Sequence, residues 1–572
     1  MIRSSGQAGE CTACYHISNI LKGESNMIHN PILPGFNPDP VVIRVNDDFY
    51  LATSSFEWFP GIPIYHSRDL ANWKLIDHAL KTKRHIDMTC LPPSKGVWAP
   101  CLSYCEAEKR FYVLYSNVYN SNRLQFDVDN LLIWADSIHG PWSEPVYINS
   151  SGFDASLFHD DDGRKWVVNQ ERDFRPGHET MRPIIIQEYC PQQQKLIGRP
   201  IRLTYGATKR GFTESPHIYK HNGMYYLMTA EGGTGYGHCV ALLRSENVTG
   251  PYESCPHNPI ITSCVEEFAM RPEISYAMLD LYNPDEVLQK AGHGSLIETQ
   301  TGEWYIAHLC GRPVMPQKRC VLGRETAIQK VEWTDDGWLR MFDGTNIAKE
   351  YVPAPKLPEH PFPKDNPRYD FDDTVLDLHF CTPRNEITPD WANLSARPGY
   401  LRLRGRESLT SNHHPSLIAR RLTAFNATVT TKMDFSADYY QHLAGLTCYY
   451  ETSNFYCIYK TYSEELNQNI IAVNGYENGK YVDGGNAHAI VEKDATVYLR
   501  AEIMTERLQF SYSTDGNTFH KLGPVLDMTV LSDEASNFGE FTGTFVGIFA
   551  QDTHTRSKYA DFDYFEYVED RK

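Results

Sequence analysis

The sequence has no long apolar run and no excess of positive charge. No stretch reaches the roughly eighteen apolar residues that a membrane-spanning helix needs, and the first thirty residues lack the apolar core of a signal peptide. The formal net charge of −18 disfavours nucleic acid and anionic membranes, which attract positive fields. We therefore expect a cytoplasmic protein that binds a small neutral ligand, with neither nucleic acid nor membrane as a partner; a homo-oligomer stays open.

The cysteines show no disulfide framework. Fourteen of them are scattered at irregular spacing, as is typical of reduced thiols. Cys11 and Cys14 form a C-x-x-C pair, but no second pair stands at zinc-site spacing. Residues 1–27 have little periodicity, so an unstructured leader is the simpler interpretation, and we expect no organic cofactor.

A repeated segment indicates the fold. A polar turn, one or two aromatic residues and an apolar run recur five times, as hairpins do. The five copies are VNDDFYLATSS (45–55), AEKRFYVLYSN (107–117), DDGRKWVVNQ (161–170), HNGMYYLMTAE (221–231) and QTGEWYIAHLC (300–310). Repeats of this size, with room for about four strands each, predict a five-bladed β-propeller over residues 28–350.

The strand before four of the five hairpins places a polar residue at an equivalent position. Counting back eleven or twelve residues from the last aromatic residue of each opening gives Asp39, Pro100, Asp154, Glu214 and His293. The first strand of a propeller blade lines the central axis. Three carboxyl groups and a histidine are therefore expected to converge on one face.

A proline-rich segment separates this propeller from a second domain. Six prolines lie between Tyr351 and Tyr369, which predicts an extended linker over 351–368. From 369 to 572, short runs alternate apolar and polar residues, the pattern of an antiparallel β-sandwich of jelly-roll or concanavalin-like type. The predicted fold class is therefore all-β.

Three converging carboxyl groups suit the hydrolysis of a glycosidic bond. One acid protonates the leaving oxygen and one carboxylate acts on the anomeric side, while a like charge nearby raises the pKa of the acid. Asp39, Asp154 and Glu214 fit these demands, although each aspartate alone also suits a turn cap. His293 suits either a core hydrogen bond or a central ion or water. Arg324 is either solvated or a fork of donors aimed at sugar hydroxyls or a carboxylate. Trp58 and Phe59 either pack a blade or wall a sugar pocket.

The sequence resembles glycoside hydrolase family 43, in particular its β-xylosidases with a C-terminal sandwich. The motifs that carry the resemblance span both domains. They include NPILPGFNPDP, ATSSFEWFPGIPIYHSRDL, GVWAP, SSGFDASLFHD, LMTAEGGT, GHGSLIETQTGEWYIAHLCGRP, CVLGRETAIQ, ARPGYLRLRGRESLTS, AGLTCYY, FTGTFVG and ADFDYF.

The resemblance implies an inverting, exo-acting β-xylosidase that releases xylose from the non-reducing ends of xylo-oligosaccharides, with α-L-arabinofuranosidase activity as an open addition. It implies Asp39 as general base, Glu214 as general acid and Asp154 as the residue that tunes and orients that acid. Substrate contacts are expected from Arg324, Trp58, Phe59, Trp98 and Phe541, the last reaching from the sandwich. His293 is expected near calcium or another hydrated cation on the axis, with no cofactor required for turnover.

Some positions depart from the family pattern. Ser215 replaces the glycine of T-E-G-P-H, Cys101 follows WAP, and QERDFRPGHE (170–179) replaces an aromatic-rich stretch. These changes leave the leaving-group subsite open. The alternatives are an arabinan- or fructan-cleaving propeller hydrolase and a non-catalytic carbohydrate-binding propeller.

Overall fold

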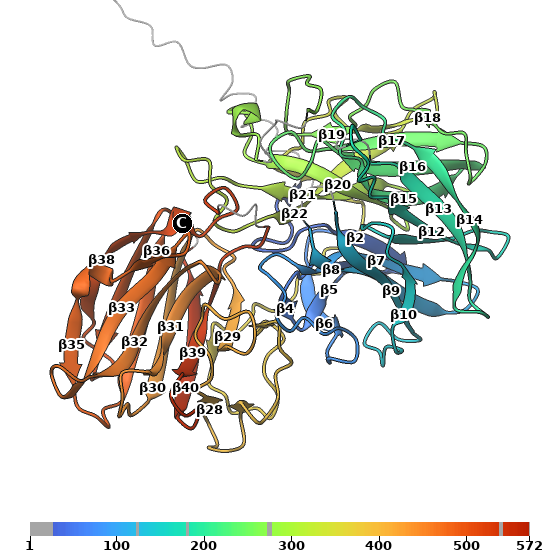
Figure 1. The fold of residues 1–572 in the computed structure, drawn as a ribbon. Coiled ribbons are helices and arrows are strands. Elements are labelled where there is room, and N and C mark those ends of the chain that lie inside the picture. The colour runs from blue at the N-terminus through green and yellow to red at the C-terminus, as the bar shows by residue number, and fades with distance from the viewer. Residues whose placement is uncertain (1–26, 122–124, 179–181, 272–276, 537–540, 571–572) are drawn as a thin grey trace, which may run out of the picture.

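A computed structural model describes residues 27–121, 125–178, 182–271, 277–536 and 541–570 of the protein. Figure 1 shows a propeller of β-sheets beside a β-sandwich. The predicted all-β, two-domain fold class is confirmed. No helix in the described part of the chain has the length and apolar character that a bilayer crossing requires. The leader predicted at 1–27 lies outside the described residues, apart from Met27, which begins the first strand.

Five antiparallel sheets form the propeller, each with its strands in chain order. Blade 1 contains β2 (Val41–Val45), β3 (Asp48–Ala52), β5 (Gly61–Ser67) and β6 (Lys74–Leu80). Blade 2 contains β7 (Gly96–Cys105), β8 (Arg110–Asn120), β9 (Asp127–Ala135) and β10 (Val146–Asn149). Blade 3 contains β11 (Ser156–His159), β12 (Lys165–Gln170), β13 (Ile184–Cys190) and β14 (Lys195–Thr204).

The last two blades follow the same plan. Blade 4 contains β15 (Glu214–His221), β16 (Met224–Glu231), β17 (Cys239–Ser245) and β18 (Glu253–Ser254), with β19 (Ile261–Thr262) also paired to β17. Blade 5 contains β20 (Gln289–Glu298), β21 (Trp304–Gly311), β22 (Glu325–Trp333) and β23 (Leu339–Met341). The short 3₁₀ turn η1 (Leu279–Leu281) lies between blades 4 and 5.

The repeated segments form the inner hairpin of each blade, as predicted. In each hairpin the last aromatic residue of the opening pairs with the preceding strand; in blade 4, for example, Tyr226 pairs with Tyr219. The turn there is Asn222-Gly223, and both residues have positive φ (49° and 82°). That is the type I′ turn that an Asn-Gly pair favours in a two-residue hairpin.

A left-handed residue recurs where each inner strand begins. The five residues are Asp39 (φ 55°), Ala99 (φ 35°), Asp154 (φ 54°), Ser215 (φ 53°) and His293 (φ 56°). Non-glycine residues adopt this conformation at a cost of about 1–2 kcal/mol each, so it is retained where it has a purpose. In blades 2, 4 and 5 the strand register also shifts at this point, as at a β-bulge. A β-bulge changes the direction of the side chains beside it, and these bulges lie at the strand positions equivalent to Asp39 and Asp154.

The propeller closes between its two ends. The first strand, β1 (Met27–His29), pairs with β24 (Tyr351–Pro353), and the side chain of Asn30 donates to the carbonyl of Ile328 on β22. The predicted linker is therefore too long at both ends. Tyr351–Pro353 forms an edge strand of a two-stranded sheet, where proline is tolerated. Arg368–Tyr369 forms β25, which pairs with the last strand of the sandwich.

The second domain packs two antiparallel sheets around a large apolar core. One sheet contains β27 (Ala392–Asn393), β28 (Leu401–Arg404), β40 (Tyr559–Glu569), β30 (Asn426–Asp434), β36 (Val497–Met504), β37 (Arg507–Ser513) and β38 (His520–Asp527). The other contains β29 (Ser416–Arg421), β39 (Phe545–Asp552), β31 (His442–Glu451), β32 (Asn454–Ser463), β33 (Gln468–Glu477) and β34 (Lys480–Val482), with β35 (His488–Val491) paired to β33. Two 3₁₀ turns are η2 (Gly484–Asn486) and η3 (Met528–Val530).

A strand pair joins the two domains directly. β4 (Trp58–Phe59), in the first blade, pairs with β26 (Thr382–Pro383) of the sandwich. The ring of Trp58 stacks on Phe545 of β39 with centroids 3.5 Å apart. The domain interface is therefore a packed apolar core, which holds the sandwich against the propeller.

Candidate active site

The three predicted carboxyl groups line one small pocket, which holds about 40 Å³. Seven of the nine residues predicted to take part in the site lie in its wall. They are Asp39, Asp154, Glu214, His293, Arg324, Trp98 and Phe541. The convergence expected from the equivalent strand positions is therefore present in the structure.

Asp39 is held by contacts from the first and fifth blades. The hydroxyl of Ser54 donates to its Oδ2 at 2.6 Å, while Arg324 Nη1 and His293 Nδ1 lie 3.6 and 3.5 Å from its Oδ1. Burial raises the pKa of Asp39, but Arg324, His293 and the Ser54 hydrogen bond outweigh it, and the pKa is lowered. Asp39 is therefore an ionised carboxylate with fixed direction, as a group that activates water must be.

The pKa values of Glu214 and Asp154 are shifted upward, in the opposite direction to that of Asp39. Burial, with the charge of Asp39, raises the pKa of Glu214 although Arg182 opposes the shift. Burial, then Glu214 and Asp39, raises the pKa of Asp154 well above its usual range. Two acids that share one buried site cannot both ionise easily, so this pair retains a proton where Asp39 does not.

The two acids are positioned by different partners. The left-handed Ser215 donates its backbone N–H to Asp154 Oδ2 at 3.0 Å, which links the third and fourth blades. Arg182 Nη1 donates to Glu214 Oε2 at 3.0 Å. No described residue donates a hydrogen bond to Glu214 Oε1, which leaves that oxygen as the one available for a proton and a ligand.

Phe541 brings the sandwich into the pocket. Its backbone N–H donates to Ser94 Oγ at 2.8 Å, and its carbonyl accepts from Arg324 Nη2 at 3.1 Å. The approach depends on glycine: a Cβ on Gly323 would lie 2.5 Å from the Thr542 carbonyl, and one on Gly543 would lie 2.7 Å from that of Leu322. The second domain therefore supplies a wall of the site, as predicted.

Aromatic rings form most of the remaining wall. Trp98 meets Phe153 and Phe541 edge-on, at centroid distances of 5.5 and 6.1 Å, and Phe126 stacks on Phe153 at 5.2 Å. Rings arranged in this way suit the apolar faces of a sugar.

Sequence reasoning missed several residues of the pocket. Phe56, Phe126, Phe153 and Thr234 line it, and Arg182 contacts Glu214 from outside the lining. Phe153 immediately precedes Asp154 in the chain, and its position next to a predicted site residue could have identified it. Arg182 had no such signal, because it follows a segment without periodicity and reaches Glu214 only through the tertiary fold.

Trp58 and Phe59 do not wall the pocket, and that prediction is wrong. Their exposed fractions are 0% and 2%, and neither lines the site. The reason is the pairing of β4 with β26, which directs the Trp58 ring into the domain interface, whereas the Phe59 ring packs in the apolar core of the first two blades. The aromatic residue that reaches the pocket from this stretch is Phe56.

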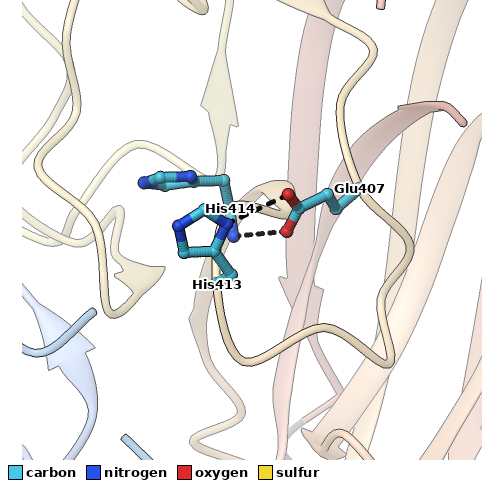
Figure 2. Close-up of side chains that lie close together, drawn as sticks. All are labelled: Glu407, His413 and His414. Atoms are coloured by element: carbon cyan, nitrogen blue, oxygen red, sulfur yellow. Dashed lines mark hydrogen bonds and ion pairs between the residues drawn. The ribbon is translucent and has the colours of Figure 1, made fainter. Parts of the chain in front are cut away.

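The hydrated ion expected at His293 stays a prediction. His293 is buried, and burial lowers its pKa against the influence of Asp39. Among the described residues, only Glu407, His413 and His414 bring three metal-binding side chains within reach of one another. Figure 2 shows that His413 Nδ1 and the backbone N–H of His414 both contact the Glu407 carboxylate.

That histidine cluster has a structural explanation of its own. Glu407 also accepts hydrogen bonds from Ser411 Oγ at 2.7 Å and from Arg556 Nη2 at 2.9 Å. Both carboxylate oxygens are thus engaged, and the arginine already balances the negative charge. The cluster braces a surface turn of the sandwich and is separate from the carboxyl pocket.

Comparison with known proteins agrees with this architecture. The family described as glycosyl hydrolases family 43 matches residues 28–339, and the β-xylosidase C-terminal concanavalin A-like domain matches residues 368–568. A xylan 1,3-β-xylosidase of a Vibrio species is 43% identical over 95% of this chain and 99% of its own length. A xylosidase/arabinosidase of Humicola insolens is 41% identical over 94% of this chain and 97% of its own.

Solved structures give the same result. The crystal structure of a xylan β-1,4-xylosidase from Bacillus halodurans superposes with a TM-score of 0.89 at 46% identity, covering 95% of this chain and all of that one. The motifs, the five-bladed propeller with its carboxyl pocket and the concanavalin-like domain all coincide with one family of hydrolytic enzymes. The chain belongs to glycosyl hydrolase family 43.

Proposed function

We propose that the protein is an exo-acting, inverting β-xylosidase that releases xylose from the non-reducing ends of xylo-oligosaccharides. The proposal rests on carboxyl groups in one pocket whose pKa values are shifted in opposite directions. Asp39 has a lowered pKa, and Glu214 and Asp154 have raised ones. Pairs of groups whose environments push their pKa values apart identify the base and the acid of a hydrolase.

The roles follow from this separation. Asp39 is the general base: ionised and directed by Ser54, it takes a proton from the water that attacks the anomeric carbon. Glu214 is the general acid: protonated by its environment, it gives its proton to the departing glycosidic oxygen. The water bonds to carbon as the glycosidic bond breaks, so the anomeric centre inverts. Asp154 tunes and orients Glu214, because the two acids share one buried site and cannot both ionise easily.

Arg324 and the aromatic residues fix the substrate. Arg324 has an exposed fraction of 2% and is held between the rings of Phe56 and Phe541, at 5.4 and 5.1 Å. A fork of N–H donors in that position suits the hydroxyl groups of a terminal sugar. The pocket is small and closed on one side by Phe541, so it suits one terminal sugar unit and exo cleavage.

The relatives' names favour xylose over other pentoses as the released sugar. They include a xylan 1,3-β-xylosidase, a xylan β-1,4-xylosidase and a xylosidase/arabinosidase. We therefore include α-L-arabinofuranosidase activity as a second activity of the same pocket. The arabinan- and fructan-cleaving alternatives and the non-catalytic binding alternative are not favoured, because all three carboxyl groups are present and aligned.

The first experiment compares two leaving groups. Asp39→Asn is expected to lower kcat/KM on both xylobiose and nitrophenyl β-xyloside by about 10²–10⁴-fold, the range for loss of a general acid or base. Glu214→Gln is expected to lose as much on xylobiose but far less on the nitrophenyl glycoside, because nitrophenolate departs without protonation. Equal losses on both substrates for Glu214→Gln would contradict its role as the acid.

Matched controls are available on the surface. Asp47→Asn and Glu106→Gln make the same chemical changes at exposed positions outside the pocket and should keep full activity. Proton NMR of xylobiose hydrolysis supplies the second readout. The first-formed anomer should be α-xylose; β-xylose as the initial product would refute the inverting mechanism. Release of arabinose from nitrophenyl α-L-arabinofuranoside tests the second activity.

A further inference from the structure

A larger cavity lies between the domains, away from the carboxyl pocket. It holds about 740 Å³, within the range of small-molecule sites. Its wall is formed by the start of the propeller, the outer part of blade 1, the segment 362–367 and the sandwich. None of the residues that line the carboxyl pocket lines this cavity. It is therefore a separate space with its own chemistry.

Two buried arginines stand in the wall of this cavity. Arg420 and Arg421 end β29, which lies on the side of the sandwich that faces the propeller (Figure 1). Their exposed fractions are 7% and 6%. Neither forms an ion pair with any residue in the described part of the chain, since no carboxylate oxygen lies within 4 Å of either guanidinium. Buried charges are almost always paired, so this arrangement lacks an anion.

The hydrogen bonds of the two arginines go to neutral groups. Arg421 Nε donates to the carbonyl of Phe36 at 2.7 Å, and Arg420 Nη1 donates to the hydroxyl of Tyr369 at 2.9 Å. Arg421 Nη2 and Arg420 Nε have no hydrogen-bond partner among the described residues. Burial and then the Arg421 charge lower the pKa of nearby His78 to about 3.

The rest of the wall adds to the positive charge. Lys74 and Lys364 are exposed at its rim, so four cationic side chains line the cavity. The two acidic side chains there are Asp365, which lies 3.4 Å from His379 Nε2, and Glu569, which accepts from Thr423 at 2.5 Å. The lining is thus net positive in a chain whose net charge is −18. Half-buried Trp73 and Phe362 supply apolar surface beside these charges.

We propose that this interdomain cavity binds a small polar ligand through an oxyanion, a carboxylate or a phosphate, held by Arg420 and Arg421. Planar guanidinium groups match both anions with paired N–H donors. The aromatic surface favours an anion carried on a ring, such as an acidic sugar, over a bare ion. The inference does not depend on the proposed catalytic function, because the two sites share no lining residue.

Isothermal titration of the full chain tests the proposal. Sodium phosphate and sodium glucuronate are the two probes, with sodium chloride at equal ionic strength as the reference. At least one of the two anions should bind saturably, and the reference should not. Binding of phosphate alone assigns a phosphorylated ligand, and binding of glucuronate assigns a carboxylated sugar. Absence of saturable binding by both anions would overturn the proposal.

Variants locate the binding. Arg420→Gln and Arg421→Gln should each weaken anion binding at least tenfold, whereas Arg507→Gln, an exposed arginine on β37, should leave it unchanged. Because the buried replacements can impair folding, the rim variant Lys74→Ala/Lys364→Ala gives an independent reading: it should weaken binding several-fold with an unchanged melting temperature. Unchanged affinity in the folded variants would place the anion elsewhere and refute the assignment.

Discussion

Arg324 and Arg182, which contact the carboxyl groups of the pocket, should act mainly on opposite limbs of the pH profile. Arg324 Nη1 lies 3.6 Å from Asp39, and Arg182 Nη1 lies 3.0 Å from Glu214. Asp39 must be ionised to act as a base, so its pKa sets the acidic limb of kcat/KM for the free enzyme. Glu214 must be protonated to act as an acid, so its pKa sets the alkaline limb.

The size of the effect can be worked from the geometry. Two unit charges about 4 Å apart attract by about 4 kcal/mol at an effective dielectric constant near 20, and 1.36 kcal/mol corresponds to one pKa unit. His293 and Ser54 remain beside Asp39 after Arg324→Gln and retain part of the effect. We therefore expect Arg324→Gln to raise the acidic limb by about 1–2 pH units, because Asp39 loses the cation that lowers its pKa.

Arg182→Gln should act on the other side. Arg182 opposes the raised pKa of Glu214, so its removal should raise that pKa further and move the alkaline limb upward, with the acidic limb unchanged. The assay is kcat/KM on xylobiose across pH for the wild type and both variants. An acidic limb that stays in place in Arg324→Gln would refute the assignment of Asp39 as the base. The alkaline limb should also rise slightly in that variant, because Arg324 lowers the pKa of Glu214 as well. Loss of overall rate does not decide the matter, since Arg324 also contacts Phe541.

Three further outcomes are expected. Ser215→Gly should stabilise the fold by about 1 kcal/mol, seen as a higher melting temperature at unchanged activity, because Ser215 has φ 53° and its buried hydroxyl has no partner among the described residues. Trp58→Ala should cost about 3–5 kcal/mol in chemical denaturation, as for a large core aromatic, while folded protein keeps its kcat. Phe541→Ala should lower kcat/KM on xylobiose about tenfold or more by removing a wall of the pocket, with the circular dichroism spectrum unchanged.

Local sequence signals predicted the parts of the fold that local chemistry determines. Asn222-Gly223 between two aromatic strands predicts a tight hairpin, and the constant interval from each hairpin to Asp39, Asp154 and Glu214 predicts their convergence. These features depend on turn geometry and on strand periodicity, which the sequence carries directly. Because the pattern recurs in five copies, both the hairpins and the convergence of the three acids could be predicted from the sequence.

Contacts between distant segments were not readable in this way. Trp58 and Phe56 stand two residues apart in one aromatic stretch, and only the pairing of β4 with β26 decides that Trp58 enters the domain interface while Phe56 reaches the pocket. Arg182 is equally hidden, because nothing local connects it with Glu214. The prolines near 351 suggested a free linker, yet closure of the propeller recruits Tyr351–Pro353 as a strand.

The contacts that hold Phe541 in the pocket have a consequence for when the enzyme becomes active during its synthesis. Protein synthesis proceeds from the N-terminus, so the propeller with its three acids emerges long before the loop that Ser94 and Arg324 hold by its backbone. A nascent or truncated propeller therefore carries a cleft open to water on one side. The enzyme therefore becomes active only after Phe541 has been synthesised and the two domains have docked. Measured activity consequently indicates that folding of both domains is complete.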